Sequence, residues 1–161
     1  MTTIAFDGRF MAADSLMTDG YNSRSYTDCK MFEKDNYVIG FSGRVSYLLK
    51  WKKTLRSTLS HVLEDGFPGW DSEKNAAEII VVCRHTLKAY CSDGGEFMPV
   101  EGENFRGGEG ALFYAIGGGS AYALSALACG KNAQGAVSTA MRFHAGTGGS
   151  IRTIDCLQEQ K

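Results

Sequence analysis

An Asp-Gly pair at positions 7 and 8 constrains the fold of this chain more than any other feature. A β-prone run, residues 3–6, precedes the pair, and a second run, residues 9–13, follows it. Asp-Gly between two such runs is typical of a two-residue hairpin turn. The pattern therefore predicts a hairpin whose first strand begins almost at Thr2. Chain ends usually fray, so a terminal strand held in a sheet suggests that the residues before it need a fixed position.

The spacing of apolar residues predicts the remaining elements. Strands are expected where β-prone runs lie between turn signals, at residues 30–32, 37–42, 79–83, 87–90, 97–100, 112–116 and 151–155. Helical spacing indicates three helices, at residues 45–63, 121–128 and 133–143. We expect Ser120 to cap the second helix and Gly130 to end it. Residues 14–28 are polar and rich in turn formers.

The order of these elements is strands, helix, strands, two helices and a final strand. Consecutive hairpins favour antiparallel sheets with helices on their outer faces, which is an α+β layered architecture. The 161 residues contain no internal repeat and no linker, so we expect one domain over residues 1–161.

Composition argues against several classes of protein. A formal net charge of -1 provides no general electrostatic basis for binding nucleic acid or an acidic membrane. The five cysteines are scattered without a C-x-x-C pair, so neither a zinc site nor a disulfide framework is expected. Asp7 and Arg9 interrupt any signal peptide, and no segment approaches the ~20 apolar residues of a membrane span. These features predict a cytoplasmic protein without cofactor or metal.

Several short motifs occur in an order that resembles the proteasome β subunits, and most closely the bacterial HslV protease subunit. Asp14 and Lys30 are sixteen positions apart, as the corresponding Asp and Lys of that family are. The resemblance covers nearly the whole chain. It is carried by Thr2-Thr3-Ile4-Ala5, Ala12-Ala13-Asp14-Ser15, Asp28-Cys29-Lys30-Met31, Ile39-Gly40-Phe41-Ser42-Gly43, the Gly-rich residues 115–123 and Thr147-Gly148-Gly149.

The resemblance implies a four-layer αββα sandwich of two mainly antiparallel sheets, as in the N-terminal-nucleophile hydrolases. It also implies catalytic roles for four residues. Thr2 would be the nucleophile once Met1 is removed, with its own α-amine as the base. An α-amine has a pKa of about 8, which suits that task. Lys30 would lower the pKa of the hydroxyl by its charge, Asp14 would hold Lys30, and the backbone at Gly43 would stabilise an oxyanion.

The chain departs from the family at positions that support the threonine amine. Gly118 and His144 replace the usual serine and aspartate, and Thr147 replaces a following serine. A histidine supplies a hydrogen bond but no fixed negative charge. More ordinary interpretations also stay open: Asp14 and Lys30 as a structural ion pair, and His144 as a partner of a helix dipole.

Three functions remain as hypotheses. The first is a threonine peptidase in a homo-oligomeric ring, which takes peptide or unfolded protein substrates and is fed by an ATP-dependent unfoldase. The second is a non-catalytic proteasome-like protein for assembly or ligand capture that retains Met1. The third interprets residues 116–120 as a phosphate cradle at a helix N-terminus, although no Gly-Lys-Ser/Thr follows.

Overall fold

The computed structural model describes residues 2–18, 24–27, 30–44, 46–49, 77–92, 96–101 and 112–158. Two sheets face each other, and each is antiparallel at every described pairing. The first has four strands in the order β10-β1-β2-β11. Its strands are β1 (Thr3–Phe6), β2 (Phe10–Asp14), β10 (Tyr114–Gly117) and β11 (Ile151–Asp155). The hairpin predicted around Asp7-Gly8 is confirmed by the pairing of β1 with β2.

The second sheet has five strands in sequence order, β5-β6-β7-β8-β9. They are β5 (Met31–Lys34), β6 (Tyr37–Gly43), β7 (Ala77–Cys83), β8 (Ala89–Ser92) and β9 (Met98–Pro99). In β7, Ile80 and Val82 face the first sheet, whereas Ile79 and Val81 pack on the opposite side. Burial on both faces explains why this strand is a continuous apolar run rather than an alternating one.

The polar, turn-rich residues 14–28 contain two short strands that were not predicted from the sequence. β3 (Leu16–Thr18) pairs antiparallel with β4 (Arg24–Tyr26) in a separate ribbon. All three residues of β4 are exposed, and only Leu16 of β3 is buried. Because backbone pairing rather than a buried face forms this ribbon, its sequence lacks the alternation that reveals a half-buried strand.

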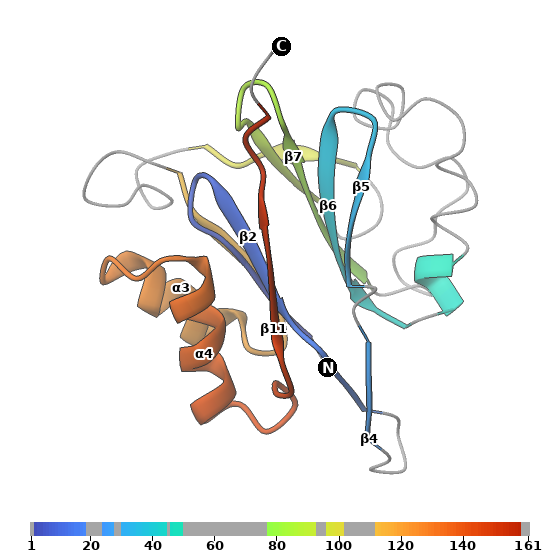
Figure 1. Ribbon diagram of the computed structural model, residues 1–161, viewed down its shortest axis with the longest axis vertical. Coiled ribbons are helices and arrows are strands. Elements are labelled where there is room, and N and C mark those ends of the chain that lie inside the picture. Colours follow the sequence, from blue (N-terminus) through green and yellow to red (C-terminus); the bar gives the residue numbers. More distant parts are fainter. Residues whose placement is uncertain are drawn as a thin grey trace.

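Two helices of small residues cover the outer face of the first sheet (Figure 1). They are α3 (Ser120–Ala128) and α4 (Ala133–Phe143). The expected cap at Ser120 is wrong: Gly119 is the N-cap of α3 and makes no side-chain cap hydrogen bond. A Cβ on Gly119 would lie 2.1 Å from Thr3 Oγ1, so no side chain fits there. Gly130, with a φ of 87°, ends α3 as predicted.

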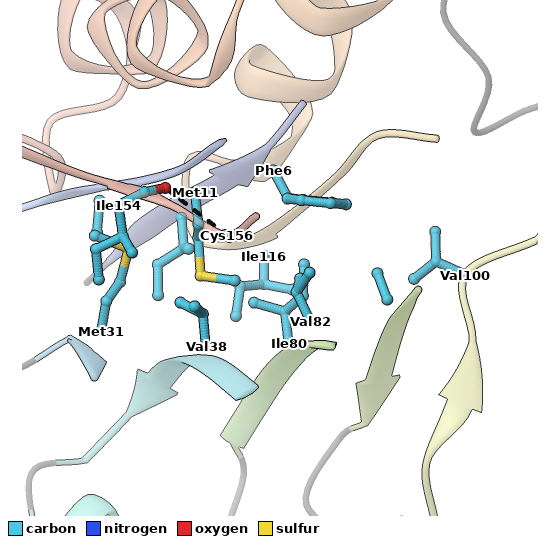
Figure 2. Close-up of a cluster of buried hydrophobic side chains, with 13 residues drawn as sticks. Phe6, Met11, Met31, Val38, Ile80, Val82, Val100, Ile116, Ile154 and Cys156 are labelled. Atoms are coloured by element: carbon cyan, nitrogen blue, oxygen red, sulfur yellow. Dashed lines mark hydrogen bonds between the residues drawn. The ribbon is translucent and has the colours of Figure 1, made fainter. Parts of the chain in front are cut away.

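Among the described residues, three hydrophobic clusters hold the layers together. One lies between the two sheets and contains Ile4, Phe6 and Met11 from one sheet and Val38, Ile80 and Val82 from the other (Figure 2). A second joins the first sheet to α3 and α4. The third covers the outer face of the second sheet, where Leu48 packs. The expected four-layer αββα sandwich is therefore confirmed.

The fourth layer is described only in part. Residues 46–49 are helical, in agreement with the helix predicted over 45–63. Residue 45 and residues 50–63 lie outside the described residues. In the part of the chain that the structure describes, no helix has the length and apolar character required to cross a membrane.

Candidate active site

The ends of four strands meet at one end of the sandwich. Thr3 begins β1 opposite Gly117, the last residue of β10. Asp14 ends β2 opposite Ile151, the first residue of β11. Antiparallel pairing thus places four strand ends beside Thr2. Met1 lies outside the described residues, and Thr2 is buried, with 8% of its surface exposed.

The carboxylate of Asp14 connects three segments of the chain. Oδ1 accepts hydrogen bonds from the backbone N of Thr3 at 2.9 Å and from Lys30 Nζ at 2.8 Å. Oδ2 accepts one from the backbone N of Gly148 at 3.0 Å. The side chain is fully buried. The ionised carboxylate therefore accepts hydrogen bonds at both oxygens and is paired with the Lys30 cation. A buried charge needs both kinds of partner.

Lys30 is held on two sides. Its Nζ donates to Asp14 and to the backbone oxygen of Leu16 at 2.6 Å, and 5% of the residue is exposed. Burial lowers the pKa of Lys30, while the hydrogen bond and charge of Asp14 raise it by less. The amine is thus an oriented group that gives up its proton more readily than a lysine in water.

Among the described residues, neither Lys30 nor Asp14 is hydrogen-bonded to Thr2. Asp14 binds the amide of the next residue, Thr3, and so fixes the peptide that follows the candidate nucleophile. The four candidate residues are therefore brought together only in part: Asp14 and Lys30 touch, and Thr2 is adjacent to the residue that Asp14 holds.

Gly117 lies between the backbone of Thr2 and the end of strand β6. A Cβ on Gly117 would lie 1.9 Å from the Thr2 carbonyl oxygen and 3.2 Å from Ser42 Oγ. The φ of Gly117 is 94°, in the left-handed region that favours glycine. The end of β6, where Ser42 precedes the exposed Gly43, thus lies beside Thr2, although no described hydrogen bond joins Gly43 to Thr2.

Glu78 is a neighbour of the site that sequence reasoning missed. It pairs with Ser42 across β6 and β7, and its Oε2 accepts a hydrogen bond of 2.7 Å from the backbone N of Gly117. The sequence contained a signal, because Glu78 is an acid at the start of an apolar run. Since this carboxylate already occupies the Gly117 N–H, the arrangement disfavours the phosphate-cradle hypothesis for residues 116–120.

Of the three positions at which this chain departs from the family, His144 and Thr147 lie on a line of hydrogen-bonding side chains that leads to Thr3. His144 Nδ1 is 2.8 Å from Thr147 Oγ1, which is 2.6 Å from Thr3 Oγ1. Thr147 and Thr3 are buried, at 4% and 0% exposure. Gly118 is exposed and has no side chain to contribute. The sequence singled out His144 and Thr147 but did not predict that they reach Thr3.

Thr2, which precedes the first strand, and the buried Lys30–Asp14 pair lie at one end of the four-layer sandwich. Comparison with solved structures specifies the fold as that of HslV and related proteins. Eukaryotic HslV from Trypanosoma brucei matches with a TM-score of 0.69 and 17% identity over 96% of this chain and 99% of that chain.

Two structures of BPH from Thiobacillus denitrificans also match. The complex with epoxomicin gives a TM-score of 0.66 and 18% identity over 96% of this chain and 97% of that chain. The other gives 0.64 and 18% over 95% of each chain. No protein-family model matches the chain, and no curated protein matches its sequence. The resemblance to HslV-like proteins is thus confirmed at the level of the fold.

Proposed function

We propose that this chain is a threonine peptidase subunit that hydrolyses peptide bonds with Thr2, exposed by removal of Met1. The observation that carries the proposal is the buried Asp14–Lys30 pair, whose carboxylate also holds the amide of Thr3. Removing two charges from water is costly, and a well-packed apolar pair would fill the same space at a lower cost. A functional site next to Thr2 accounts for retaining the charges there.

In the proposed reaction, Thr2 Oγ1 attacks the carbonyl carbon of the substrate while its proton passes to the α-amine of Thr2. Lys30 stabilises the developing alkoxide, and the backbone around Ser42 and Gly43 donates to the oxyanion. Collapse breaks the C–N bond, and the protonated α-amine gives its proton to the leaving amine. Water then hydrolyses the acyl ester and restores Thr2.

Partners and location follow the same resemblance. We propose peptide or unfolded protein substrates, a homo-oligomeric ring in the cytoplasm and delivery by an ATP-dependent unfoldase. The ring is implied by the resemblance to HslV. The fold that this chain shares with HslV over 96% of its length supports that resemblance.

A non-catalytic proteasome-like protein is the second candidate, and two observations favour it. Gly118 offers no side chain toward the threonine amine, and among the described residues His144 reaches Thr3 rather than Thr2. Such a protein would keep Met1, which leaves Thr2 without a free amine.

Epoxomicin is the probe that separates the two candidates, because it is bound to BPH in one of the similar structures. Protein shown by intact mass to begin at Thr2 is incubated with epoxomicin, and the adduct is located by tandem mass spectrometry. The peptidase predicts one adduct on Thr2 that Thr2→Ala abolishes. Protein that begins at Thr2 and forms no adduct would refute the peptidase.

A further inference from the structure

Three buried or half-buried hydrogen-bonding side chains form a line from the end of α4 to the first strand. His144 is the C-cap of α4, and its backbone N donates to the oxygen of Ala140 at 2.8 Å. Thr147 N donates to the His144 oxygen at 3.1 Å, so a tight turn fixes the two side chains relative to each other. Thr147 then bridges His144 and Thr3, with spacings of 2.8 and 2.6 Å. We call His144, Thr147 and Thr3 the hydroxyl relay.

Gly119 packs against the hydroxyl relay. A Cβ on Gly119 would lie 2.1 Å from Thr3 Oγ1 and 2.9 Å from Thr147 Oγ1. The relay is therefore packed directly against backbone. Among the described residues, the Thr3 hydroxyl has Thr147 as its hydrogen-bond partner, and the Thr147 hydroxyl has Thr3 and His144.

The number of available protons determines which group donates in each hydrogen bond of the relay. Each hydroxyl has one proton to donate, and a neutral imidazole has one donor and one acceptor nitrogen. If Thr3 donates to Thr147 and Thr147 donates to Nδ1 of His144, both hydroxyl protons are used. In the opposite direction, the proton of the fully buried Thr3 hydroxyl has no acceptor among the described residues, and an unmet buried donor is costly.

We infer that His144 is a positioning residue: its neutral ring, protonated at Nε2, accepts the hydroxyl relay and thereby locks Thr3 beside the nucleophile Thr2. The inference rests on the proposed function for the role of Thr2. Thr3 is then held twice, by Asp14 at its amide and by Thr147 at its hydroxyl. This fixes the peptide on which the direction of Thr2 depends.

The test joins a spectroscopic measurement with kinetics. Two-bond ¹H–¹⁵N correlation spectra report which imidazole nitrogen bears the proton, and His144→Asn identifies the His144 signals among the three histidines. We expect the Nε2–H form at pH ~8 in the wild type and in Thr147→Ser. In Thr147→Val, which is isosteric but has no hydroxyl, we expect a mixture of the two tautomers.

The kinetic arm uses Met1-free protein and a threonine-directed electrophile. Thr147→Val should react about tenfold more slowly than Thr147→Ser, a barrier difference of about 1.4 kcal/mol. His144→Asn keeps an acceptor near the Nδ1 position, so it should react faster than His144→Ala, which has none.

A His144 ring protonated at Nδ1, or a tautomer that Thr147→Val leaves unchanged, would overturn the relay. Equal rates for Thr147→Val and Thr147→Ser, or for His144→Asn and His144→Ala, would overturn the positioning role. If the wild type beginning at Thr2 does not react at all, the proposed function fails. The tautomer measurement still decides the relay in that case.

Discussion

The carboxylate of Asp14 lies 2.9 Å from the backbone nitrogen of Thr3 and 2.8 Å from Lys30 Nζ through the same oxygen atom. One buried side chain thus connects the start of the first strand to a buried cation. The stability of the N-terminal hairpin and the electrostatics of the candidate site depend on the same group.

Replacing Asp14 with alanine should destabilise the protein strongly. Removing one partner of a buried ion pair leaves the other charge uncompensated, at a cost of about 3–5 kcal/mol. The matched control is Arg9→Ala, which breaks an ion pair of 2.8 Å whose side chains are 53% and 40% exposed. That change should cost less than about 1 kcal/mol. Urea unfolding measures the free energy of unfolding of both variants. Equal decreases for Asp14→Ala and Arg9→Ala would contradict the role of the buried pair.

The pKa of Lys30 should lie below 10.5 and should fall further in Asp14→Asn. Burial lowers this pKa, and Asp14 is what raises it, so removing the carboxylate leaves burial unopposed. Because the unfolded state binds more protons between the two pKa values, the free energy of unfolding should rise with pH across that window. An NMR titration of the lysine side-chain signals measures the shift, and a Lys30 that titrates above 10.5 would contradict it.

A methyl group at Gly117 should be far more damaging than one at Gly130. Both glycines have φ near 90°, so alanine is strained at either position, at about 1–2 kcal/mol. Only at Gly117 would the Cβ collide with backbone, 1.9 Å from the Thr2 oxygen, whereas nothing lies within 4 Å at Gly130. Gly130→Ala should remain folded and Gly117→Ala should lose at least several kcal/mol more. Urea unfolding measures the stability of the two variants, and similar midpoints for Gly117→Ala and Gly130→Ala would refute this geometry.

Two cysteines should differ sharply in their reactivity. Burial raises the pKa of Cys156 to about 12, and its thiol lies in the core between the sheets (Figure 2). Cys129 is exposed at the end of α3. Since the thiolate is the reactive form, iodoacetamide at pH ~8 should modify Cys129 and spare Cys156 until the protein unfolds. Peptide mapping after timed labelling measures this, and early labelling of Cys156 would count against the packing.

The sequence predicts the parts of the fold that depend on local patterns. The hairpin at Asp7-Gly8, helix 133–143 and strand 151–155 follow from turn chemistry and apolar spacing, and the structure has them. The ribbon of β3 and β4 could not be predicted, because exposed backbone pairing leaves no apolar pattern. The error at Ser120 is of another kind: Thr3, far away in the sequence, leaves no space for a capping side chain at Gly119.

The candidate site shows the same division. The sixteen-position spacing of Asp14 and Lys30 indicated that they act as a pair, and the structure has them as a buried ion pair. The link from His144 to Thr3 joins residues more than a hundred positions apart, so only tertiary packing reveals it. Glu78 was visible as an acid in an apolar strand, but its partner, the N–H of Gly117, was not.

The central claim is that Thr2 is a nucleophile. The most direct test is the mass of Met1-free protein after reaction with a threonine-directed electrophile, measured beside Thr2→Ala and Thr2→Ser. The account predicts one adduct on Thr2 in the wild type, none in Thr2→Ala, and an adduct at a changed rate in Thr2→Ser, which keeps the hydroxyl. An unmodified wild type, or an adduct that persists in Thr2→Ala, would contradict it.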